Sequence, residues 1–340
     1  MKFSPMPLSC VEAQNALHHL QSLEQEFNQT LSAAAKAPDQ ESARQAITKA
    51  KALKQTIERE IAALREQLPS QDITASWTNP ETGETKEITL NLKEYLATHQ
   101  ALYRKHLNLE ITPDHERAFR QIWRQNRAEI QREIELYGYD TLLLIPENLP
   151  DLETLNTKLI ETMPDDKTNT GRVRPTYQSD DFKQGGSWSG VKNTAPSQPR
   201  LILTKGVQNI YHSQDPIMEA TLGKNIMALT GLSQAEVEKK IQNNEPLPIN
   251  FEADIKGQKI RISAEGLFLE EYLLHQRLYF DQTGKHLDEQ GWTWLLKSLS
   301  GSRVVFVGWD PAYRGLSVGA DDPVSVSDSL GGRFSRSFVL

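Results

Sequence analysis

Apolar residues at the start of the chain recur at three- and four-residue spacing in two runs. The first run comprises Val11, Leu17, Leu20, Leu23, Phe27 and Leu31. The second comprises Ala43, Ile47, Ala50, Leu53, Ile57, Ile61, Leu64 and Leu68. This spacing places the apolar side chains on one face of a helix, so each run predicts a helix. Only Pro38 and Asp39 interrupt them, and Asp39 can cap the second helix, so we expect a helical hairpin that ends at Pro69.

The apolar stripe of this hairpin has two interpretations. It can pack against the rest of the molecule, or it can form a coiled-coil contact with a partner or a second copy of the chain. We favour the first because two short heptad runs are a weak signal for oligomerisation. Self-association through the N-terminal helices stays open as the alternative.

Two short runs of alternating apolar and polar residues follow, at 72–77 and 84–90, and predict a β-hairpin. The residues between them, Asn79 to Gly83, have the composition of a turn. Two further helices are expected over 93–107 and 113–137. Pro113 and Asp114 suit the first turn of the second one.

The pattern changes near Gly138, where we place a domain boundary. Residues 1–137 are expected to form a mainly helical region, and residues 138–340 a second domain. Strands are predicted at 142–145, 201–203 and 259–262, helices at 151–163, 218–227, 233–242 and 267–283, and a loop-rich stretch over 165–199. Helices followed by short irregular strands give the α+β class.

Charge and cysteine content exclude several classes. The net charge of −7 argues against a general binder of nucleic acid or anionic membranes. Cys10 is the sole cysteine, so an intramolecular disulfide and a zinc site built on several thiolates are excluded. Residues 1–9 hold no apolar signal core, and no apolar run is long enough to span a membrane. We therefore expect no membrane insertion and a cytoplasmic location by default.

The last stretch of the chain has an unusual composition. From Leu299 to Leu340 there is no Lys, Glu, Gln or Met, although Arg and Asp are present. A β-rich end with many turns explains part of this bias. It does not explain why Arg replaces Lys completely. Mutation directed at the adenines of AAC and AAT codons offers a second explanation, because the resulting codons cannot encode Lys, Glu, Gln, Met or Trp. Every residue from Phe306 to Ser329 except Trp309 can be encoded by such codons.

The same stretch resembles the C-terminus of the target (variable) proteins of diversity-generating retroelements. The resemblance is carried by GSRVV at 301–305, WDP at 309–311 and LGGRFSRSF at 330–338. Upstream, GGSWSGVKN at 185–193 and TGKHLDEQGWTWL at 283–295 resemble framework segments of these proteins. The likeness covers roughly residues 138–340 and does not extend to the helical region before them.

The resemblance implies a C-type lectin-like fold, of the type shared with formylglycine-generating enzymes, and a variable region at about 303–340. By position it implies a scaffold of Trp292, Trp294, Arg303, Trp309, Leu316, Val318, Leu330, Gly331 and Arg333. It implies variable, ligand-binding positions at Phe306, Gly308, Asp310, Tyr313, Arg314, Ser317, Gly319, Asp321, Val324, Ser325, Val326 and Ser327. Tyr313 and Arg314 are expected to be the strongest anchors, because Tyr and Arg are enriched in binding hot spots. Leu316 and Val318 alternate with Ser317 and Gly319, which predicts a strand with one face buried and the other offered to a ligand.

The sequence gives little support for a catalytic or metal site. Formylglycine-generating enzymes use paired cysteines in this domain, which has none, so no catalytic residue is assigned. The acid pairs Asp321-Asp322 and Asp288-Glu289 are expected to be solvated. His286 has no partner at metal-ligand spacing and is expected to be structural. We therefore expect no metal and no cofactor.

These observations lead to one expected function and one alternative. The chain is expected to be a ligand-binding protein, not an enzyme, with a hypervariable surface directed at a protein or glycan. The alternative is a structural or assembly protein that acts through its N-terminal helical hairpin.

Overall fold

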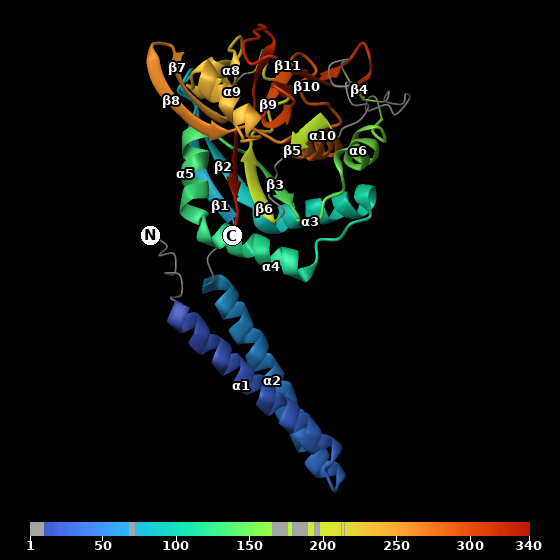
Figure 1. Cartoon of the computed structure of the whole chain (residues 1–340). Coiled ribbons are helices and arrows are strands. Elements are labelled where there is room, and N and C mark those ends of the chain that lie inside the picture. Colours follow the sequence, from blue (N-terminus) through green and yellow to red (C-terminus); the bar gives the residue numbers. More distant parts are fainter. Residues whose placement is uncertain are drawn as a thin grey trace. The chain divides into compact units, whose positions relative to one another are not determined.

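A computed structural model describes residues 10–67, 72–164, 176–178, 190–193, 198–211, 213 and 215–340 (Figure 1). The contacts within the chain divide it into two compact units, Met1–Gln71 and Asp72–Leu340. Each unit is described by itself below. The described helices offer no candidate for a membrane-spanning segment.

The first unit is the expected helical hairpin. Helix α1 spans Cys10–Ala35 and helix α2 spans Gln40–Gln67. The carboxylate of Asp39 accepts a hydrogen bond from the backbone N–H of Ser42 at 2.8 Å, which confirms its expected capping role. His19 lies beside Glu60 and Lys49 beside Glu26, so the two helices run antiparallel.

The second unit begins with a β-hairpin and a helical segment. Strand β1 (Asp72–Thr78) pairs antiparallel with β2 (Thr85–Asn91), as expected. The side chain of Asn79 accepts hydrogen bonds from Glu81 and Thr82 and shapes the turn between them. The helical elements that follow are α3 (Leu92–Leu102), a π-helical turn (Tyr103–Leu107), α4 (Pro113–Gln125) and α5 (Arg127–Tyr137).

Two sheets form the rest of this unit. The first has the strand order β3-β6-β13-β8-β7, with β7 and β8 drawn in orange in Figure 1. The second has the order β12-β9-β10-β11-β4, and β5 also pairs with β9. The first sheet comprises β3 (Thr141–Ile145), β6 (Arg200–Thr204), β7 (Pro248–Ile255), β8 (Gln258–Glu265) and β13 (Ser335–Phe338). The second comprises β4 (Tyr177–Gln178), β5 (Val191–Asn193), β9 (Trp292–Ser300), β10 (Arg303–Asp310), β11 (Gly315–Asp321) and β12 (Leu330–Gly332).

Helix α10 (Leu269–Thr283) is the most buried helix of this unit and packs against strands of both sheets. Its apolar residues share a core cluster with side chains of β3 and with one face of β9, β10 and β11. Gly284 ends the helix in the left-handed conformation, at φ +68°, as expected of a glycine at this position. The remaining helical elements are α6 (Leu152–Leu155), a π-helical turn (Asn156–Ile160), α7 (Pro216–Glu219), α8 (Ile226–Thr230) and α9 (Gln234–Gln242).

The mixture of helices with one antiparallel and one mixed sheet agrees with the expected α+β class. Two expected helices were wrong in detail. The helix over 113–137 breaks at Asn126, whose side-chain amide donates to the Ile122 carbonyl at 2.9 Å. The helix over 218–227 is two short helices separated by Gly223, which has φ +67°. Strand β7 was not expected. Of the loop-rich stretch 165–199, the structure describes only 176–178, 190–193 and 198–199.

The compact unit begins at Asp72, so the division of the chain does not fall near Gly138 as expected. Residues before Gly138 complete the core of those after it. Ile130 and Ile134 are fully buried in one cluster with Leu142 and Leu144. The ring of Trp77 occupies the space beside Gly138, where a Cβ atom would lie only 2.7 Å from it. The helices of 72–137 therefore belong to the same folded unit as the sheets.

Candidate functional site

Three neighbouring strands, β9, β10 and β11, build the candidate site. They pair antiparallel, and Phe306 on β10 lies opposite Trp294 on β9 and Gly319 on β11. Successive side chains of a strand point to opposite faces of a sheet. On one face, Val305, Val307 and Trp309 of β10 join the core cluster that contains α10, together with Leu316, Val318 and Ala320 of β11. Phe306, Gly308, Ser317, Gly319 and Asp321 therefore alternate onto the other face.

On this second face, each of two aromatic rings lies against a glycine of the next strand. A Cβ atom on Gly308 would lie 2.9 Å from the ring of Trp292, and one on Gly319 would lie 2.5 Å from Cζ of Phe306. Such distances leave no room for a side chain. Both glycines thus allow an aromatic ring to approach the backbone closely, which is a common use of glycine inside a strand.

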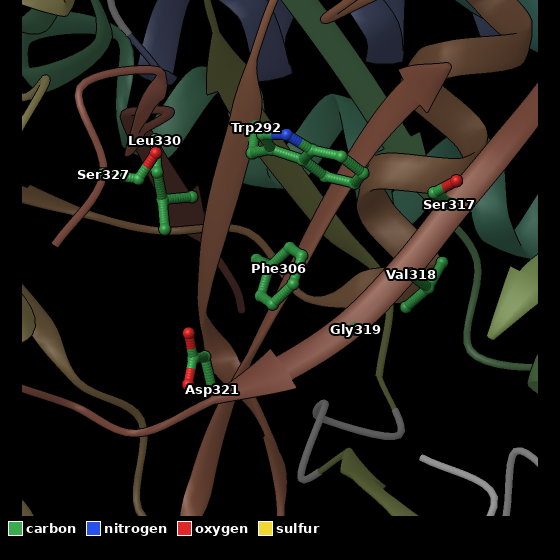
Figure 2. A pocket seen from close by; sticks show the side chains of 8 residues that line it. All are labelled: Trp292, Phe306, Ser317, Val318, Gly319, Asp321, Ser327 and Leu330. Carbon is green, nitrogen blue, oxygen red and sulfur yellow. The ribbon is translucent and has the colours of Figure 1, made fainter. Parts of the chain in front are cut away.

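The rings of Trp292 and Phe306 form part of a pocket of about 290 Å³. Their centroids are 5.4 Å apart and their planes stand at 87° to each other. Figure 2 shows Phe306 at the centre of the pocket, with the other lining side chains around it. The lining residues are Trp292, Phe306, Ser317, Val318, Gly319, Asp321, Ser327 and Leu330.

Asp321 is the one ionisable side chain among the described residues that line the pocket. Its Oδ1 accepts a hydrogen bond from the backbone N–H of Asp322 at 2.7 Å. The loop 322–329 continues from it and carries Asp322 and Asp328 but no Lys, Arg or His. Val324 and Val326 of this loop are 48% and 58% exposed, which is high for valine. The pocket thus combines aromatic walls, an acidic rim and an exposed apolar loop.

The structure brings five of the expected ligand-binding residues together at this pocket: Phe306, Ser317, Gly319, Asp321 and Ser327. Three others, Val324, Ser325 and Val326, lie on the adjoining loop. Leu316 and Val318 are buried in the core, as expected. The expected exposed face of this strand was wrong, because Ser317 is only 5% exposed and Gly319 is buried as well; both contribute to the pocket wall.

The expected anchors Tyr313 and Arg314 lie elsewhere. They belong to the turn between β10 and β11, at the opposite end of β11 from Asp321, which is about 20 Å along a strand of this length. Asp310 shapes this turn, because its Oδ1 accepts hydrogen bonds from Ala312 and Tyr313 at 2.9 Å. Gly308 is buried beneath the ring of Trp292. A Cβ atom at this position would lie only 2.5 Å from the Gly291 carbonyl oxygen, so Gly308 offers no free surface.

The expected scaffold residue Arg333 lies in the centre of a buried polar network. Its guanidinium is fully buried and donates to both carboxylate oxygens of Asp288, at 3.0 and 2.8 Å. Asp288 also accepts from the hydroxyls of Tyr272 and Thr293. Burial lowers the pKa of Arg333, but the charge of Asp288 outweighs this and holds the pKa above its ordinary value. The expectation that Asp288 is solvated was wrong, because Arg333 provides a buried counter-charge.

Most other scaffold residues are buried too. Trp294, Trp309, Leu330 and Gly331 are inaccessible or nearly so, whereas Arg303 is half-buried. The ring of His286 stacks on Trp309 with centroids 3.4 Å apart, which agrees with its expected structural role. Trp292 was expected only as scaffold but lines the pocket. The framework segment at 185–193 lies mostly outside the described residues.

No group of three or more His, Cys, Asp or Glu side chains that could hold a metal ion occurs within the described ranges. Besides the two aromatic rings, the described residues that line the pocket offer two hydroxyls and one carboxylate. Comparison of the chain with protein-family models, curated proteins and solved structures finds no match.

Proposed function

We propose that this chain is a ligand-binding protein, not an enzyme, and that it presents a variable surface on a C-type lectin-like domain diversified by a retroelement. The variable surface comprises the pocket formed by Phe306, Ser317, Gly319 and Asp321 of β10 and β11, together with the loop 322–329. Its ligand is a protein or a glycan. The lectin-like fold and the diversification both rest on the resemblance of the C-terminal sequence.

One observation carries the proposal. The stretch from Leu299 to Leu340, which contains no Lys, Glu, Gln or Met, includes most of the residues that line the pocket and the whole of the adjoining loop. The residues that alternate with them along β10 and β11 are buried in the core cluster that contains α10. A rigid sheet that holds the pocket walls in place limits the conformational entropy lost on binding. This division between fixed and changeable positions is what a diversified binding protein requires.

Sequencing the last part of this gene and its flanking DNA across a natural population tests the proposal. We expect substitutions to cluster between Phe306 and Ser329 and to be confined to codons that are AAC or AAT in a nearby template repeat. Within that window we expect Phe306, Ser317, Asp321 and Ser327 to vary and Trp309 to stay fixed. A uniform tail, without a template or a reverse transcriptase gene nearby, would remove the diversification claim.

A second candidate function is assembly through the helical hairpin. Within α1 and α2, Thr30 and Ala50 are the only buried side chains among those described at 15–61, whereas Leu17, Leu31 and Ile47 are 57%, 43% and 46% exposed. Sedimentation equilibrium of the full chain, compared with the variant Leu17→Gln/Leu31→Gln, tests this. A wild-type dimer that the variant converts to a monomer would favour assembly, and a monomer in both cases would exclude self-association.

A further inference from the structure

We infer that the pocket lined by Trp292, Phe306 and Asp321 takes a cationic side chain, Lys or Arg, of a protein ligand. This inference rests on the proposed function and names the chemistry of the ligand for this copy of the variable surface.

The two rings supply the first reason. Aromatic faces carry negative electrostatic potential and attract ammonium and guanidinium groups within about 6 Å of the ring centroid. Trp292 and Phe306 both line the pocket and form an edge-to-face pair, with centroids 5.4 Å apart and planes at 87°. A cation in the pocket can lie within about 6 Å of the rings, and the aliphatic part of its side chain has apolar surface to cover.

The charge distribution supplies the second reason. The Phe306 ring lies against Gly319 of β11. Asp321 comes two residues later along β11, so its carboxylate lies on the same face of the sheet. No ion pair of Asp321 occurs within the described part of the chain. Asp322 and Asp328 follow in the adjoining loop, which holds no cationic residue. A cationic guest would neutralise Asp321, whereas an anionic guest would meet repulsion from three carboxylates.

The rigidity of the walls supplies the third reason. Each ring is held against a glycine of the neighbouring strand, Trp292 against Gly308 and Phe306 against Gly319. Phe306 also packs edge to face with Trp294, at a centroid distance of 5.9 Å and an angle of 87°. Rings that are already fixed lose little freedom when a guest enters. A volume of about 290 Å³ suits one protruding side chain rather than a larger ligand.

The exposed valines point to a protein as the source of the cation. Val324 and Val326 lie on the loop that follows Asp321, so they can cover apolar residues beside an inserted Lys or Arg. Contacts that surround an anchor residue and exclude water from it are typical of hot spots in protein–protein interfaces.

The test uses the full chain and two small probes, N-acetyl-lysine N-methylamide and its uncharged analogue N-acetyl-norleucine N-methylamide. Nitrogen-15 NMR follows the indole N–H of Trp292 during each titration. We expect the lysine probe to shift this signal and to bind about tenfold more tightly than the norleucine probe, the preference expected of a partly desolvated cation–π contact. Added salt should weaken the binding of the lysine probe but not that of the norleucine probe, because salt screens the charge of the ammonium group.

Two matched variants locate the effect. Asp321→Asn should abolish most of the preference for lysine, whereas Asp322→Asn, which removes the same charge from the next residue, should retain most of it. Phe306→Leu keeps an apolar side chain but removes one ring. It should weaken the binding of the lysine probe more than the binding of the norleucine probe. Equal binding of both probes, equal effects of the two Asp variants, or no shift of the Trp292 signal would each overturn the inference.

The outcome can be separated from that of the proposed function. If population sequencing shows clustered variation but the pocket shows no preference for lysine, the binding surface stands and the cationic ligand is wrong. If the tail is uniform but the lysine preference is present, the pocket is a cation site and the diversification claim fails.

Discussion

At the scale of single residues, Arg333 is where we expect the largest loss of stability. Its guanidinium and the carboxylate of Asp288 are both buried and bonded to each other. Arg333→Met would leave that carboxylate buried without a counter-charge, which typically costs about 3–5 kcal/mol. Urea denaturation should show this decrease in the free energy of unfolding.

The control for Arg333 is Arg261→Met, which changes an exposed arginine on β8. We expect it to alter the free energy of unfolding by less than about 0.5 kcal/mol. A cost for Arg333→Met as small as that of the control would mean that water or another group replaces the ion pair.

His99 is expected to make stability depend on pH. Its Nδ1–H donates to the Tyr95 carbonyl, and its Nε2 accepts from the Leu144 N–H. Burial lowers its pKa from 6.5 to about 4, although the Tyr95 carbonyl opposes this. The unfolded chain therefore binds a proton that the folded chain does not. Stability is fully present above pH 6.5 and is lost as pH falls towards 4, by about 1.4 kcal/mol per pH unit.

Denaturation between pH 4 and 7 tests this in the wild type and in His99→Gln. Glutamine can donate and accept hydrogen bonds but does not titrate, so the pH dependence should become shallower by about one proton. His275 contributes in the same direction, because burial and Arg333 lower its pKa too, and this part should remain. His18→Gln, at an exposed position, serves as the control. An identical slope in all three proteins would rule His99 out.

At the scale of elements, the contact between Phe306 on β10 and Gly319 on β11 is expected to couple two variable positions. A side chain at 319 would collide with the ring, so Gly319→Val should cost about 1–3 kcal/mol. In a chain that also carries Phe306→Ala, the valine fills space that the ring has left. A double-mutant cycle by urea denaturation should give a coupling energy of at least about 1 kcal/mol. Additive effects would show that the ring moves aside freely.

Elements defined by local signals could be predicted from the sequence. The β1–β2 turn and the ends of α2 and α10 depend on Asn79, Asp39 and Gly284, whose side chains or backbones act on their own neighbours. Strand β7 was missed although Ile249, Phe251, Ala253 and Ile255 alternate along it. The signal that could have revealed it is the turn at Lys256-Gly257, where both residues have positive φ, because such turns join hairpin strands.

The pocket could be predicted only in part. Alternation along β11 separated its two faces, because it depends on a period of two within one strand. The expectation that one face is offered to a ligand was wrong for most of the strand, because Ser317 and Gly319 are buried and only Asp321 at its end is partly exposed. The aromatic walls depend on which residues lie opposite each other on β9, β10 and β11. A shift of one residue in that register would turn every side chain to the other face. Local sequence does not fix this register, so Trp292 was expected only as a scaffold residue. Tyr313 and Arg314 were expected to be the strongest anchors, but they lie at the opposite end of β11 from the pocket.

At the scale of the whole molecule, the resemblance of 138–340 to a known family suggested a domain that the packing does not isolate. The hydroxyl of Tyr137 donates to the Ser263 carbonyl at 3.2 Å and accepts from the Ser263 N–H at 3.1 Å, which ties α5 to β8. Arg336 on β13 pairs with Glu129 at 2.9 Å. A folded unit is defined by the surface it buries, and these contacts place residues before Gly138 inside that unit.

A truncation series tests where the folded unit begins. We expect residues 72–340 to unfold cooperatively in urea, with a transition close to that of the corresponding unit in the full chain. Residues 138–340 would expose the core side chains that contact Ile130, Ile134 and Trp77, so this fragment should lose its cooperative transition and bind the dye ANS. A cooperative transition in 138–340 would instead show that this segment folds alone and that residues 72–137 only cover it.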